Sequence, residues 1–149
     1  MTVTVTTTGF AALESRMKSL SNDFATKVGQ SANRAGAVVI QKKIKEAVPI
    51  GPHAEGSIRN RTRKSGKVVQ EEHSKIINNI KVRKVRAEAG RVVNAIVVGK
   101  DAYHASFVEF GSIHNAPNPF FRTGFALASE DAVDRIKAVL AKRLDKAGV

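Results

Sequence analysis

Cysteine and tryptophan are absent from this chain of 149 residues. Without cysteine the chain can form neither a disulfide framework nor a thiolate metal site, and its composition fits a reducing compartment. Long apolar runs are also missing, since no stretch approaches the roughly 20 apolar residues that a membrane-spanning helix needs. The start, MTVTVTTTGF, has neither the basic beginning nor the apolar core of a signal peptide. We therefore expect synthesis in a cytoplasm and no membrane partner.

Acidic residues are scarce relative to basic ones. Thirteen Asp and Glu face 25 Lys and Arg, which gives a formal net charge of +12. Such a balance predicts a polyanionic partner or an acidic protein neighbour. Nucleic acid is the commonest partner of this kind, because a basic surface gains by releasing counterions condensed on phosphates. The length is enough for one domain, residues 1–149, with a modest core.

Patterns of catalytic and metal-binding residues are missing as well. The four histidines, His53, His73, His104 and His114, form no H-x-x-x-H pair, and none lies beside a suitable carboxylate ligand at helical spacing. No serine lies in a G-x-S-x-G motif, and no glycine-rich phosphate loop follows a predicted strand. The sequence therefore predicts no catalytic residue, no metal site and no cofactor, and we expect the protein not to be an enzyme.

Two long helices are predicted from apolar residues spaced three and four apart. The first covers residues 9–47, with Gly29 and Gly36 as positions for a kink and Pro49 as the terminator. The second covers residues 119–146, opens at a proline suited to a first turn, and has acidic residues early and basic residues late.

Strand patterns lie between and before these helices. Residues 77–100 predict a β-hairpin with a turn near 87–90, a basic half-exposed first strand and a more buried second strand. The alternating Thr and Val of residues 1–8 indicate a short strand or an extended arm, with a frayed terminus as the equal alternative. The predicted fold is α+β: a small antiparallel sheet packed by the two long helices.

A basic segment joins the first helix to the hairpin. Residues 50–76 contain little to bury, so we expect a long exposed loop. Its cations are candidate contacts for DNA phosphates or for an acidic partner, with a solvated loop as the alternative: Arg59, Arg61, Arg63, Lys64 and Lys67. No aromatics interleave with them and no helix-turn-helix is present, so any contact with DNA would be without sequence specificity.

The aromatic residues are concentrated in one segment. Residues 103–125 hold the only tyrosine and five of the seven phenylalanines. Residues 103–110 predict a short helix with Tyr103, Phe107 and Phe110 on one face, and residues 111–118 predict a loop. We expect the C-terminal helix to be packed onto the sheet by the phenylalanines of this segment: Phe107, Phe110, Phe120, Phe121 and Phe125.

One carboxylate, Glu109, lies between two phenylalanines. An acid in such surroundings can have a raised pKa and catalytic use. No nucleophile or second acid accompanies it, however. A salt bridge or cap that closes the loop, with Arg122 as the nearest cation, is the favoured interpretation.

The same segment resembles the signature of the phage neck and tail-completion proteins, also known as head–tail joining or minor tail proteins. The residues that carry the resemblance are Tyr103, Phe107, Val108, Glu109, Phe110, Gly111, Pro119, Phe120, Phe121 and Arg122. The preceding order of elements also matches. Phe121 departs from the aliphatic residue that is usual there, and residues 50–76 are longer and more basic than the family's link.

The resemblance implies a structural virion protein of the neck or tail, made in a host bacterial cytoplasm. It implies a homo-oligomeric ring between the portal side of the head and the tail terminator or tail tube, with phage DNA passing through the lumen. The alternative is a free-standing, nonspecific DNA-binding protein.

Overall fold

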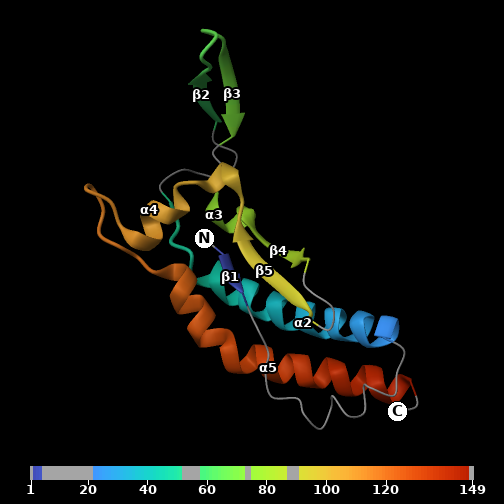
Figure 1. The fold of residues 1–149 in the computed structure, drawn as a ribbon. Coiled ribbons are helices and arrows are strands. Elements are labelled where there is room, and N and C mark those ends of the chain that lie inside the picture. The colour runs from blue at the N-terminus through green and yellow to red at the C-terminus, as the bar shows by residue number, and fades with distance from the viewer. Residues whose placement is uncertain (1, 5–21, 52–57, 73–74, 87–90, 148–149) are drawn as a thin grey trace.

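The computed structural model of this chain describes residues 2–4, 22–51, 58–72, 75–86 and 91–147. Two long helices, α2 (Asn22–Ala47) and α5 (Phe120–Lys146), lie side by side and run in opposite directions, with a small sheet against them (Figure 1). Both predicted helices are confirmed over these ranges, and α2 ends two residues before Pro49. The part of the first prediction that covers residues 9–21 lies outside the described residues.

The α2–α5 interface is built from small residues. An added Cβ at Gly36 of α2 would lie 2.6 Å from the Ile136 Cγ1 atom, and one at Gly124 of α5 would lie 2.6 Å from the Ile44 Cα atom. The helix axes can approach closely because neither position carries a side chain. Helix α2 continues through both of its glycines, so neither of them breaks the helix. At Gly36 the reason for glycine is this close packing.

Gly124→Ala is expected to lower the free energy of unfolding by roughly 1–3 kcal/mol, because the new methyl group meets backbone atoms of α2 that cannot move aside. Gly29→Ala is the matched control, since its added Cβ would lie an ordinary 3.4 Å from Val92 Cγ2. It should stabilise the protein by up to about 1 kcal/mol through helix propensity. Denaturant melts of both variants check this, and equal stabilisation by the two would contradict the packing argument.

The main sheet has three antiparallel strands in the order β1-β5-β4. The central strand β5 (Val93–Val98) pairs with β4 (Ile80–Val85) on one side and with β1 (Thr2–Thr4) on the other. The predicted hairpin and the N-terminal strand are therefore confirmed, and β1 lies on the sheet of its own chain. The predicted turn at 87–90 and the rest of the arm, residues 5–8, lie outside the described residues.

The hairpin begins three residues later than predicted, because Ile76–Asn79 form a short helix, α3. The Asn79 side chain donates a hydrogen bond to the Lys75 carbonyl at 2.9 Å, which closes this turn. The Asn79 carbonyl in turn accepts from the Gly99 N–H at 2.9 Å. These bonds fix the entry of the chain into β4 against the end of β5.

The core lies between the sheet and the two helices. Its largest buried residues are Ile40 and Ile44 of α2, Ile80 and Ile96 of the sheet, and Phe120 and Phe121 at the start of α5. A polar side chain of α2 also ties this helix to the sheet, since the Gln41 amide donates a hydrogen bond to the Ile80 carbonyl at 2.7 Å. The start of α5 is therefore the position where the C-terminal helix is anchored to the rest of the fold.

A second, two-stranded sheet occupies the segment that was expected to be a loop. Strands β2 (Ile58–Thr62) and β3 (Val68–Glu72) pair as an antiparallel hairpin that rises from the end of the molecule near α3 (Figure 1). The prediction of a structureless loop is wrong here, although the predicted exposure is confirmed. The segments IRNRT and VVQEE consist mostly of polar residues, so they lack the regular alternation of apolar and polar residues that identifies strands.

Candidate interaction surfaces

The tip of the β2–β3 hairpin is a defined turn. The Gly66 N–H donates to the Arg63 carbonyl, and the Arg63 N–H donates to the Lys67 carbonyl, each at 2.9 Å. Gly66 has a φ of 78°, a left-handed value that glycine adopts without strain. A type I turn followed by a left-handed glycine is a common three-residue hairpin loop. The spacing Lys64-Ser65-Gly66 is the sequence signal by which this hairpin could have been found.

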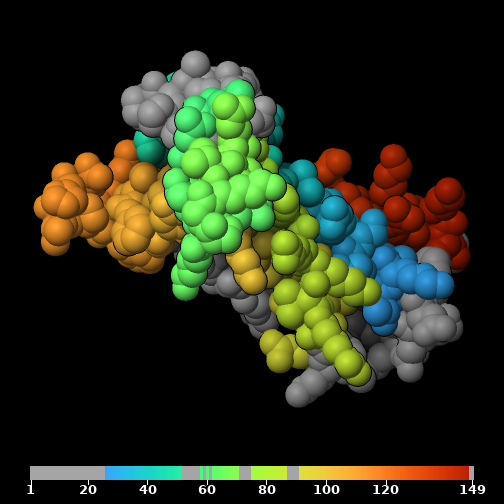
Figure 2. Space-filling view, turned by 90° about the horizontal axis from the view of Figure 1, so that it is seen from above, coloured from blue at the N-terminus to red at the C-terminus, as the bar shows by residue number. Residues whose placement is uncertain are grey.

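The hairpin brings the five predicted basic residues onto one element. Arg63, Lys64 and Lys67 are exposed at the tip, and Figure 2 shows the hairpin nearest the viewer at this end of the molecule. In the strands, Arg59 pairs in register with Glu71, and Arg61 with Val69. Because strand residues alternate between faces, this register assigns the cationic positions 59, 61, 63 and 67 to one face. Ile58, Asn60, Thr62, Val68, Gln70 and Glu72 belong to the other face, whose single charged residue is Glu72. We call it the Ile58–Val68 face.

The Ile58–Val68 face of the hairpin exposes apolar side chains that sequence reasoning did not single out. Ile58 is 62% exposed and Val68 is 58% exposed. An isolated two-stranded hairpin is only marginally stable in water. A hairpin with exposed Ile and Val on one face and a cationic row on the other is suited to contact another molecule.

A second exposed surface follows β5. The chain passes through the 3₁₀ turn Lys100–Ala102 into the short helix α4 (Ala105–Phe110). Tyr103, Phe107 and Phe110 are 63%, 52% and 59% exposed, so the predicted packing of Phe107 and Phe110 onto the sheet is wrong. Phe120 and Phe121 are buried and Phe125 is partly buried against the core, which confirms the other three.

The inward face of α4 explains this correction. Small residues, Ala102 and Ala105, are buried in the core, and Val108 packs against them. The remaining inward position is Glu109, whose side chain is completely buried. A six-residue helix can bury only one face, and here the carboxylate occupies it while the large rings face outward.

Glu109 joins α4 to the beginning of α5. Its Oε2 atom accepts the Phe121 N–H at 2.8 Å, and its Oε1 atom accepts the Arg122 N–H at 3.2 Å and the Arg122 Nε–H at 2.9 Å. The first N–H groups of a helix have no partner within the helix, and a negative charge there also interacts favourably with the helix dipole. The prediction of a cap or salt bridge with Arg122 is confirmed. Glu109 caps the start of α5 and also forms a salt bridge with the Arg122 side chain.

Arg122 also connects the carboxylate to the aromatic surface. Its guanidinium lies over the Phe110 ring, 5.2 Å from the ring centroid. Next to it, Tyr103 and Phe107 make an edge-to-face pair with ring centroids 6.4 Å apart. We define the aromatic surface as Tyr103, Phe107 and Phe110. The motif residues Glu109, Phe110 and Arg122 therefore form one connected group.

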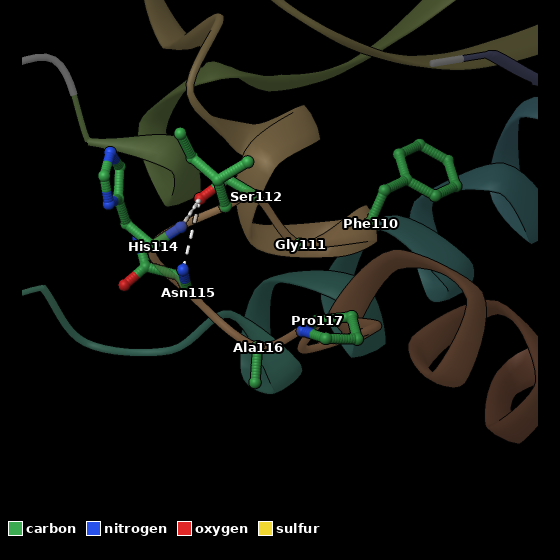
Figure 3. A pocket seen from close by; sticks show the side chains of 8 residues that line it. Phe110, Gly111, Ser112, His114, Asn115, Ala116 and Pro117 are labelled. Carbon is green, nitrogen blue, oxygen red and sulfur yellow. Dashed lines mark hydrogen bonds between the residues drawn. The ribbon is translucent and has the colours of Figure 1, made fainter.

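The loop between α4 and α5 is shaped by Gly111 and Ser112. Gly111 has a φ of 83°, and an added Cβ would lie 3.1 Å from the Pro117 ring, so glycine is required there. The Ser112 Oγ atom accepts the N–H groups of His114 and Asn115 at 3.2 Å each (Figure 3). The hollow that this loop lines from Phe110 to Pro117 is wide open to solvent. Pro119 lies at the N-cap of α5, one residue before the first-turn position that was predicted.

Groups suited to metal binding do not gather anywhere in the described ranges. Among those residues, no three His, Asp or Glu side chains are placed to hold a metal ion. His104 and His114 lie at the start of α4 and in the loop after it, and His53 and His73 lie outside the described residues. No described helix is long and apolar enough to cross a membrane. What the described surface offers is two protruding contact regions, the hairpin and the aromatic surface.

Comparison with known proteins gives one match. Residues 11–111 match the family model described as "Bacteriophage HK97-gp10, putative tail-component". That range covers more than half of the chain and contains α2, both hairpins and α4. Searches of curated proteins and of solved structures gave no match.

Proposed function

Since this chain belongs to the HK97-gp10-like family of bacteriophage tail components, we propose that it is a ring-forming subunit of the phage neck. In this proposal copies of the chain form a closed ring that joins the portal side of the head to the tail terminator or tail tube. Phage DNA passes through the lumen without sequence-specific contacts. The family match carries the proposal, because it assigns the chain to the structural proteins of the phage tail.

The two protruding surfaces support an assembly role. A ring subunit needs one surface that reaches a neighbour and another that receives it, and these two surfaces must differ. The hairpin and the aromatic surface around α4 are two such regions, and both lie near the end of the molecule where α5 begins (Figure 1). The basic residues of the hairpin give the ring a region that attracts DNA phosphates.

Assembly is tested by measuring the mass of the purified full chain over a range of concentrations, by light scattering and native mass spectrometry. We expect one closed oligomer of defined subunit number, seen as an annular particle by electron microscopy. A chain that stays monomeric at every concentration, or that forms open filaments, would overturn the proposed ring.

The basic hairpin tip also supports the alternative of a free-standing DNA-binding protein. Filter binding to duplex DNA across a salt series separates the two. The alternative predicts tight binding whose log affinity falls by about 0.9 per phosphate contact for each tenfold rise in salt. The ring proposal predicts weak binding by the isolated subunit. An Arg63→Ala, Lys64→Ala, Lys67→Ala variant tests whether the tip supplies the contacts, and Lys142→Ala on the exposed end of α5 is the control.

A further inference from the structure

We propose that the β2–β3 hairpin of one copy docks, by its Ile58–Val68 face, on the aromatic surface of a neighbouring copy. The inference rests on the proposed ring and names the contact that would build it. In this contact the neighbour's hairpin covers Tyr103 and Phe107, which the described fold leaves exposed. The contact also supports the hairpin, which has no core of its own.

The hairpin has the shape of a docking element. Its Ile58–Val68 face exposes these two apolar side chains, and its strands rise away from α4 of the same chain (Figure 1). The chain therefore does not cover its own aromatic surface with this hairpin. A second copy supplies the same hairpin on a separate body, and contact between two different surfaces of identical subunits closes a ring where the rotation allows.

The distribution of charge makes the aromatic surface the region that such a basic hairpin can approach with less repulsion. The hairpin, residues 58–72, has five Lys or Arg and two Glu, a formal charge of +3. Two copies of a chain with a net charge of +12 repel each other over most of their surfaces. Residues 101–121, in contrast, contain no Lys or Arg and one exposed acid, Asp101, although the chain has 25 basic residues in all. The nearby Arg122 is already paired with Glu109.

The chemistry of the rings fits the same occupant. Rings of Tyr and Phe pack well on β-branched side chains such as those of Ile58 and Val68. Their π faces also attract nearby cations, as the Arg122 guanidinium over Phe110 already illustrates within the chain. Packing by the Ile58–Val68 face leaves the cationic positions 59, 61, 63 and 67 on the outer side of the docked hairpin. The same element can then contact a polyanion while it holds the neighbouring subunit.

The natural absence of cysteine allows a direct test by crosslinking. A Val68→Cys variant is mixed with a Phe107→Cys variant of the full chain and treated with a short bis-maleimide. The expected result is a crosslinked dimer between the two variants, which can only be intermolecular. Val68→Cys mixed with Leu127→Cys is the matched control, because Leu127 is exposed on α5 away from α4 and should give no dimer.

Association is measured in parallel. Tyr103→Ala combined with Phe107→Ala should weaken self-association at least tenfold and leave the thermal melt of the monomer unchanged, whereas Leu127→Ala should change neither. Oligomers of normal mass with no Val68–Phe107 crosslink, or with unchanged affinity in the double alanine variant, would overturn the docking contact and leave the ring intact. A chain that never associates would overturn the ring and this contact together.

Discussion

Phe120→Ala is expected to lower the free energy of unfolding by about 3–5 kcal/mol, because it removes a fully buried ring and leaves a cavity. Phe120 is the first residue of α5, and its ring lies edge to face with that of Phe121, with ring centroids 6.3 Å apart. Both rings belong to the cluster that contains Ile40 and Ile44 of α2 and Ile96 of β5. Truncation at this point therefore loosens both helices and the sheet together.

The matched control for this variant lies in the same aromatic segment. Phe107→Ala removes the same number of atoms from a ring that is about half exposed, and we expect a loss below about 1 kcal/mol in denaturant melts of the monomer. The measured quantity is the denaturant concentration at the midpoint of each melt. It is compared at an unchanged slope of the unfolding free energy against denaturant, so that the comparison reports stability alone. Similar losses for the two variants would contradict the assignment of Phe120 to the core and of Phe107 to the surface.

The difference between these two phenylalanines marks the limit of what the sequence could predict. Long elements repeat their pattern over several turns, so α2, α5 and the β4–β5 hairpin were predictable from spacing alone. Helix α4 has only six residues, too few for a period to show which face is inward. The large rings suggested burial, but the core beneath α4 has room only for Ala105, Val108 and the Glu109 side chain.

The β2–β3 hairpin was missed for a related reason. Its strands carry polar or charged residues at most positions, and the apolar residues Ile58, Val68 and Val69 are too few to indicate a buried face. Only the turn chemistry around Gly66 distinguished the segment from a solvated loop. Of the candidate site, the sequence therefore predicted the exposure of Arg63, Lys64 and Lys67 at the tip. The structure added the strand register, which assigns positions 59, 61, 63 and 67 to one face.

The Glu109–Arg122 contact was predictable because a carboxylate between two aromatic residues needs a partner, and one cation follows the loop. The two backbone N–H donors at the start of α5 could not be predicted, since they depend on how the loop returns the chain. Gly111, Ser112 and the hydrogen bond from the Asn118 N–H to the Val108 carbonyl, at 2.8 Å, set that return.

Glu109→Gln is expected to lower the free energy of unfolding by about 2–4 kcal/mol, through loss of a buried charge-assisted cap. The substitution keeps the shape of the side chain but replaces one accepting oxygen with an NH₂ donor. Each Glu109 oxygen accepts at least one N–H group, so in either orientation the amide nitrogen faces a donor at the start of α5. Amide hydrogen exchange at Phe121 and Arg122 should accelerate more than exchange in the middle of α5, which would place the loss at the cap.

Arg122→Ala separates the cap from the ion pair. The Arg122 side chain is mostly exposed, and removing it leaves both backbone N–H groups in place on Glu109. Because Glu109 keeps two backbone N–H donors, this variant should cost clearly less than Glu109→Gln, even with the loss of the contact to Phe110. If Arg122→Ala were as destabilising as Glu109→Gln, the ion pair would be the main contribution and the backbone cap a minor one. If only Glu109→Gln destabilises, the carboxylate acts chiefly as the N-terminal cap of α5, and Arg122 is left free to shape the aromatic surface.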